Sequence, residues 1–92
     1  MREAEIEAHL VKRVKELGGE VRKVQWIGRS GAPDRLVMLP AQREYESTFW
    51  VELKAPGQKA KPHQQREHDR MRAMGQRVVV IDSIEGVEEL LA

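Results

Sequence analysis

The feature that most constrains the fold is a strand, a helix and a strand in close succession in the second half of the chain. Thr48 to Lys54 alternates apolar and polar residues, His63 to Met74 has helical character, and Arg77 to Asp82 contains a continuous run of valine and isoleucine. Such a run is typical of a strand that is buried on both faces. Parallel strands joined through a helix almost always cross over with a right hand. The segment therefore predicts a β-α-β unit within an α/β domain.

Helices are predicted at both ends of the chain. In residues 3–17 apolar side chains recur at steps of three and four, which places them on one face of a helix. These residues are Ile6, Leu10, Val14 and Leu17. Gly18 and Gly19 end the predicted helix, because glycine readily adopts the left-handed conformation of a helix C-terminus. Ser83 can cap a short final helix.

Two further strands are predicted before the β-α-β unit. Residues 20–27 and 36–39 have the composition of strands, and a break containing two glycines and a proline separates them. Residues 40–47 are polar, so the second of these strands and the strand after it are expected to form an antiparallel hairpin. We expect one α/β domain over residues 1–92. Its order is α-β-β-β-α-β with a short C-terminal helix, and its mixed four-stranded sheet is flanked by helices.

Composition narrows the class of protein. The chain has 92 residues and no cysteine, so its small core gains no disulfide, and pairing with a second copy would add buried surface. No apolar run approaches the ~20 residues needed to span a bilayer, and the N-terminus lacks the apolar core of a signal peptide. We therefore expect a cytoplasmic protein with no membrane partner.

Charge is unevenly distributed along the chain. The net charge is only +1, but residues 54–77 hold seven basic and two acidic residues. A local excess of positive or negative charge indicates the kind of binding partner better than the net charge of the whole chain does. This basic segment favours contact with nucleic-acid phosphates, although an ordinary solvated helix is the alternative.

Two short motifs carry the candidate chemistry: Pro33-Asp34 before one strand and Glu52-Leu53-Lys54 at the end of the next. If the hairpin turn centres near residue 43, Asp34 lies opposite Glu52, and Lys54 points from the same face as Glu52. Neighbouring carboxylates repel one another unless a cation offsets them, and Mg²⁺ or Mn²⁺ suits such oxygen ligands. A cation there can activate water and neutralise charge on a phosphoryl oxygen. Alternatively, these charges form a solvated strand face and a turn.

The two motifs, taken with the helix that follows, resemble a known family. Gly-x-Pro-Asp followed after a hairpin by Glu-x-Lys resembles the PD-(D/E)xK nuclease superfamily, whose fold is restriction-endonuclease-like. Within it, the blocks at residues 29–37, 49–57 and 62–75 resemble the VRR-NUC family of virus-type replication-repair nucleases. The resemblance covers roughly residues 3 to 91.

The resemblance implies a set of site residues. The implied ligands of Mg²⁺ or Mn²⁺ are Asp34, Glu52, Glu7 and the carbonyl of Leu53. Lys54 would be the catalytic lysine, with Gln64 beside it. Glu3, one turn before Glu7, is an alternative to it as the helical acid.

The resemblance also implies a function. It predicts a metal-dependent, structure-selective DNA endonuclease, similar to a dimeric Holliday junction resolvase, in a bacterial or phage-infected cytoplasm. A non-catalytic DNA-binding module with this fold is one alternative. A nuclease subunit of a larger replication, repair or restriction assembly is another.

Several further residues are candidates for contact with the DNA backbone. They are Lys23, Arg29, Ser30, Lys59, Lys61, Arg66 and His68. His68 shares a helix face with Gln64, so it could support a metal ligand or contact a phosphate, whereas a solvated helix surface is the alternative.

Overall fold

Strands adjacent in the sequence are also neighbours in the sheet of the computed structural model, which describes residues 1–41 and 47–92. The strands are β1 (Glu20–Lys23), β2 (Arg35–Met38), β3 (Thr48–Leu53) and β4 (Val78–Ile81). β1 pairs with β2 and β2 pairs with β3 in antiparallel orientation, whereas β4 lies parallel to β3. The helices are α1 (Glu3–Glu16), α2 (Pro62–Ala73) and α3 (Ile84–Leu91). The predicted element order and mixed sheet are confirmed.

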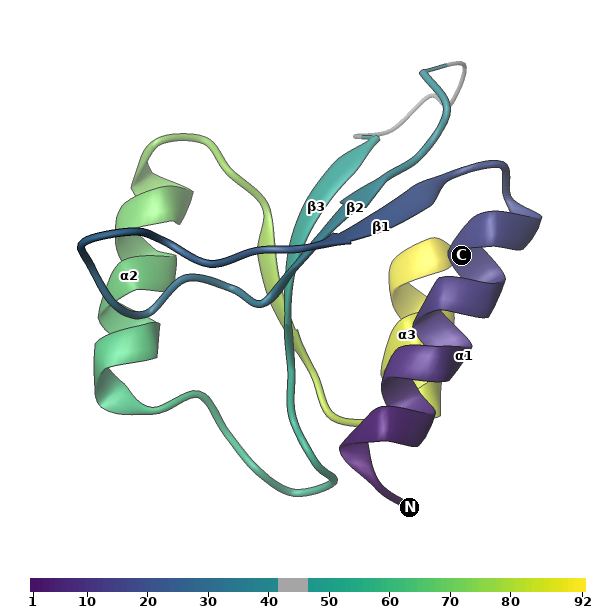
Figure 1. The fold of residues 1–92 in the computed structure, drawn as a ribbon, viewed down its shortest axis with the longest axis horizontal. Helices are drawn as coiled ribbons and strands as arrows, with labels where there is room; N and C mark the ends of the chain where they lie inside the picture. The colour runs from purple at the N-terminus through teal and green to yellow at the C-terminus, as the bar shows by residue number, and fades with distance from the viewer. Residues whose placement is uncertain (42–46) are drawn as a thin grey trace.

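The helices form two layers, one on each side of the sheet (Figure 1). α1 and α3 lie side by side on one face, and α2 covers the other. The predicted β-α-β unit is therefore present, with α2 connecting β3 to its parallel neighbour β4. The predicted cap is also present, since Ser83 Oγ accepts a 2.9 Å hydrogen bond from the Gly86 amide.

The register of the β2–β3 hairpin matches the predicted one. Arg35 lies opposite Val51 and Met38 opposite Thr48. Extending this register by one residue places Asp34, at the start of β2, next to Glu52. The predicted turn centre near residue 43 lies outside the described residues.

The predicted strand over residues 20–27 is too long. β1 ends at Lys23, and the chain then leaves the sheet as a loop over residues 24–34, which runs to α2 and back (Figure 1). The amide of Val24 donates to the carbonyl of Asp34 at 3.0 Å and closes the base of this loop. Beyond this bond, the later half of the predicted strand lies outside the sheet, and its Trp26 donates a hydrogen bond to Glu67 of α2.

The apolar core lies between the sheet and the α1–α3 layer. Three α1 residues at helical spacing, Ile6, Leu10 and Val14, are completely buried in it. They meet alternate residues of β3 (Phe49, Val51 and Leu53) and Val87 of α3. Burying one such side chain contributes about 1.5–3 kcal/mol, so this layer supplies most of the hydrophobic stabilisation. Within the described ranges, no helix has the length and apolar character to cross a membrane.

Candidate active site

Two carboxylates meet where β2 begins and β3 ends. Asp34 Oδ1 accepts a 3.1 Å hydrogen bond from the amide of Leu53, and the side chain of Glu52, the preceding residue, is buried. Burial and the charge of Asp34 together raise the pKa of Glu52 to about 7. Burial likewise raises the pKa of Asp34, although the Leu53 amide opposes the shift. The structure thus brings the two predicted acids together, and the charge of Asp34 makes Glu52 harder to ionise.

Gln64 connects the acid pair to Lys54. Its Oε1 accepts hydrogen bonds from Lys54 Nζ and from the amide of Lys61, both at 2.9 Å. Its Nε2 donates to Glu52 Oε2 at 3.3 Å. The Lys54 ammonium lies 3.6 Å from that same carboxylate oxygen. Because Gln64 is in the first turn of α2, the start of this helix fixes the positions of the lysine and the glutamate.

The acid pair has the properties expected of a divalent cation site. Glu52 Oε1 is buried and has no hydrogen-bond partner within the described part of the chain. Leaving a charged oxygen unpaired is costly, and a hard cation such as Mg²⁺ or Mn²⁺ would satisfy it. Within residues 1–41 and 47–92, however, no three His, Cys, Asp or Glu side chains converge closely enough to hold a metal. The protein side chains that fit the ion are thus the pair Asp34 and Glu52.

Glu7 does not converge with this pair in the described residues, and its role as a metal ligand stays a prediction. Its carboxylate forms an ion pair with Arg35, the first residue of β2. Arg35 thus neutralises Glu7. Glu3, one turn earlier, is the α1 acid whose charge raises the pKa of both Asp34 and Glu52. The role of the Leu53 carbonyl stays a prediction.

His68 is completely buried, so the suggested contact with DNA is wrong. It lies on the α2 face that packs against the sheet, and its Nε2 is 3.9 Å from Glu52 Oε1. Burial lowers the pKa of His68, and the charge of Arg72 adds to this effect. A neutral imidazole behind Glu52 is consistent with the other suggested role, support of a metal ligand.

The remaining candidates for DNA contact are on the surface. The exposed residues are Lys23, Arg29, Ser30, Lys59, Lys61 and Arg66. Arg29 also has a structural partner, because its Nη2 lies 3.2 Å from Glu67 Oε1. Contact of these residues with DNA stays a prediction.

A buried carboxylate on α2 was missed by the sequence reasoning. Glu67 is 5% exposed, and its Oε2 accepts a 2.8 Å hydrogen bond from Trp26 Nε1. Arg70 donates to its Oε1 at 3.0 Å. The spacing of residues along the sequence could have indicated this burial. The inner face of α2 is defined by residues that recur at steps of three, one and three, namely Gln64, Glu67, His68 and Met71.

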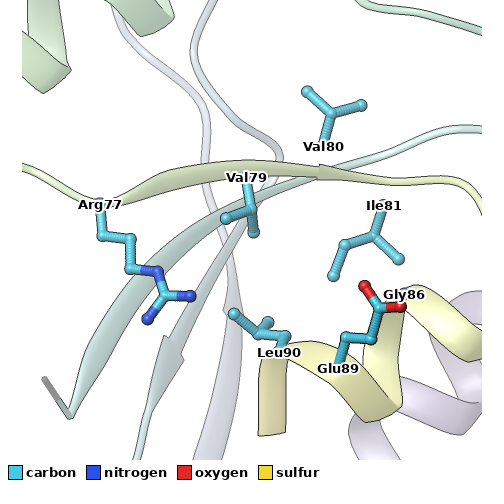
Figure 2. Close-up of a pocket in the computed structure, with 7 residues that line it drawn as sticks. All are labelled: Arg77, Val79, Val80, Ile81, Gly86, Glu89 and Leu90. Atoms are coloured by element: carbon cyan, nitrogen blue, oxygen red, sulfur yellow. The ribbon is translucent and has the colours of Figure 1, made fainter. Parts of the chain in front are cut away.

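A cavity of about 340 Å³ lies elsewhere, between β4 and α3 (Figure 2). It is lined by Arg77, Val79, Val80, Ile81, Gly86, Glu89 and Leu90. Figure 2 shows Val79 and Ile81 pointing toward α3, whereas Val80 points away from it. Val80 is the strand partner of Glu52, and strand partners share a sheet face. The acid pair and this cavity are therefore on opposite sides of the sheet.

Comparison with known proteins gives three similarities. A family model described as the VRR-NUC domain matches residues 2–85. A protein of Acyrthosiphon pisum secondary endosymbiont phage 1 named "Putative nuclease p44" is 48% identical over 83 residues, which span 90% of this chain and 85% of that protein. A solved structure described as a VRR_NUC domain is similar with a TM-score of 0.85 and 41% identity, covering 97% of this chain and 92% of the other. The matched region contains the acid pair, Lys54 and Gln64.

Proposed function

The chain belongs to the VRR-NUC family and is a nuclease, and we propose that it is a metal-dependent endonuclease that hydrolyses phosphodiester bonds in branched DNA. One observation carries the proposal. The buried Glu52, next to Asp34, leaves one carboxylate oxygen without a protein partner, while Lys54 lies 3.6 Å from the other oxygen. Two acids that can hold a cation and a fixed ammonium group suit the hydrolysis of a phosphodiester.

In this mechanism Asp34 and Glu52 would hold Mg²⁺ or Mn²⁺. When bound, the cation would supply Lewis acidity toward the scissile phosphate. Lys54, held by Gln64, places a positive charge where negative charge develops on the phosphoryl oxygens. A water oxygen forms a new bond to phosphorus and gives up one proton to solvent, while the bond from phosphorus to one sugar oxygen breaks and that oxygen takes up one proton from solvent. Glu52 must be ionised to hold the cation, and cation binding favours that ionised state.

Selectivity for branched DNA and a dimeric state are parts of the same proposal. Exposed basic residues such as Lys59, Lys61 and Arg66 flank the first turns of α2, where they suit phosphates of any sequence. Two copies related by a two-fold axis would present two sites and make paired incisions, as in a Holliday junction resolvase. A bacterial or phage-infected cytoplasm is the location proposed, and the similarity to a phage protein supports it.

The test is a cleavage panel with the purified chain. Four-way junction, flap and linear duplex are incubated with and without Mg²⁺ or Mn²⁺. Asp34→Ala and Lys54→Ala are each expected to lower the single-turnover rate at least 100-fold. Glu85→Gln, which changes an exposed acid of α3, is the matched control and is expected to leave the rate unchanged.

The same panel distinguishes the alternatives. Salt-sensitive DNA binding without cleavage would indicate a non-catalytic module. Cleavage only after a partner is added would indicate a subunit of a larger assembly. Equal residual cleavage by the parent and by Asp34→Ala would point to a contaminant and overturn the assignment.

A further inference from the structure

The loop over residues 24–34 presents a fully exposed isoleucine. Ile27 is the most exposed of the large apolar side chains in the described residues. The next residue, Gly28, has a φ of +83° and no atom near its Cβ position, so the chain turns there in open solvent. The two residues form the tip of a loop that begins at the end of β1 and ends at Asp34.

Both neighbours of this tip are attached to the same buried carboxylate. Trp26 donates to Glu67 at 2.8 Å, and Arg29 lies 3.2 Å from the other oxygen of that carboxylate. Arg70, one turn further along α2, also binds Glu67, at 2.8 Å through Nη2. Glu67 therefore fixes the positions before and after the tip.

The rest of the loop is also held in place. Gly31 lies so close to α2 that a Cβ there would be 2.9 Å from both Glu67 Cβ and the His63 carbonyl oxygen. The hydrogen bond from Val24 to Asp34 closes the base of the loop. Single exposed apolar side chains are common on protein surfaces. Ile27 differs from most of them because the loop that carries it is held at both sides of the tip and at its base.

We propose that Ile27 is a wedge that enters the base stack of DNA at a branch point. The inference rests on the proposed function and deepens it, because it assigns a residue to the choice of branched substrates. Isoleucine is one of the apolar side chains that proteins insert between base steps. Unstacking a step costs least where stacking is already interrupted, so a branch point accepts the wedge more readily than continuous duplex does.

The surroundings of Ile27 fit DNA better than a second copy of the chain. The adjacent Arg29 side chain is 57% exposed and retains donors for the phosphates on either side of a base step. The loop ends at Asp34, so the wedge and one member of the acid pair belong to the same short segment of chain. A stable protein interface needs about 800 Å² per partner, and a single isoleucine at a two-residue tip supplies only a small part of that area.

Two measurements on the intact chain test the wedge. The first follows the fluorescence of 2-aminopurine placed at the branch point, with Ca²⁺ in place of Mg²⁺ so that cleavage does not interfere. The parent is expected to raise the fluorescence, Ile27→Ala to raise it much less, and Ile27→Leu to restore the rise. Met74→Ala is the matched control, because it truncates another exposed apolar residue, at the end of α2, and is expected to behave like the parent.

The second measurement is the ratio of cleavage rates on branched and linear DNA. Ile27→Ala is expected to lower this ratio at least tenfold while linear duplex is cut at the parental rate within threefold. An unchanged ratio and an unchanged fluorescence rise would overturn the wedge. A fall in molar mass by light scattering for Ile27→Ala would overturn it as well, in favour of an interface between copies. If the parent binds and unstacks junctions but cuts no DNA, the proposed function fails and the wedge stands.

Discussion

The two faces of the sheet are built from different kinds of side chain. On the α1–α3 face the buried residues form one apolar cluster. The buried polar residues of the described chain, Glu52, Glu67 and His68, all lie at the interface with α2. Both ring nitrogens of His68 and one oxygen of Glu52 have no hydrogen-bond partner among the described residues; one oxygen of Glu7 on α1 also has none, but Arg35 compensates its charge. Unpaired buried polar groups are destabilising. We therefore infer that the α1–α3 layer stabilises the domain, whereas the α2 layer contains the functional polar groups, which lower its stability.

The largest expected effect is in the apolar layer. Leu10→Ala leaves a cavity among fully buried neighbours, and we expect it to lower the free energy of unfolding by about 2–5 kcal/mol. Urea titration followed by circular dichroism measures this change. Leu10→Met, the volume-conserving control, is expected to cost less than about 1.5 kcal/mol. A loss below 1 kcal/mol for alanine would contradict the assignment of stability to this layer.

A substitution in the acid pair should raise the free energy of unfolding, which is the opposite of the effect of Leu10→Ala. The folded state raises the pKa of Glu52 from 4.5 to about 7, so it binds this proton more tightly than the unfolded chain does. Metal-free stability should therefore increase as pH falls from about 7 toward 4.5. Glu52→Gln should raise metal-free stability at pH 8 by up to about 3 kcal/mol. Thermal unfolding in chelator measures this, with Glu85→Gln as control, and a destabilised Glu52→Gln protein would contradict it.

Glu67 is a buried acid of the same layer whose charge is compensated. Burial acts to raise its pKa, but hydrogen bonds from Arg70 and Trp26 and the charge of Arg29 outweigh it, and the net pKa is lowered. Its stabilising contribution is therefore present above the ordinary pKa and is lost as pH falls through the lowered value. We expect Glu67→Gln to cost about 1–2 kcal/mol at pH 7 and to reduce the loss of stability in acid. If unfolding curves at pH 7 and pH 3 show the same difference from the parent, the charge of Glu67 does not contribute.

The smallest expected effect is at the start of α3. Ser83 accepts a hydrogen bond from Gly86 at 2.9 Å, and Ser83→Ala is expected to cost about 1 kcal/mol. Because α3 belongs to the apolar layer, neither the pH dependence of stability nor DNA cleavage should change. A Ser83→Ala protein with parental stability but altered cleavage would contradict the assignment of stability to one layer and of catalysis to the other.

The sequence was sufficient to predict the features that depend on local patterns. Apolar spacing predicted α1, and alternation in β3 predicted which residues face the core. The hairpin register followed from the turn position, and it placed Asp34 beside Glu52 without any knowledge of the tertiary structure. Lys54 followed from its place on the same strand face as Glu52, and Gln64 was located through the family resemblance.

The features that the sequence did not predict depend on contacts between distant segments. Glu3 and Glu7 share a face of α1, and the ion pair with Arg35 is what separates Glu7 from the acid pair. β1 is shorter than predicted because Trp26 binds Glu67 of α2. Charged neighbours on α2 concealed its inner face, which is why the burial of His68 was not foreseen.

The most direct test of the central claim is a calorimetric titration of the metal-free chain with Mn²⁺ at pH 8, in parallel with Glu52→Gln. It measures occupation of the acid pair independently of cleavage. We expect the parent to bind Mn²⁺ and Glu52→Gln to bind it at least tenfold more weakly. A parent that does not bind Mn²⁺, or equal affinity in the two proteins, would contradict the assignment of Asp34 and Glu52 as a cation site.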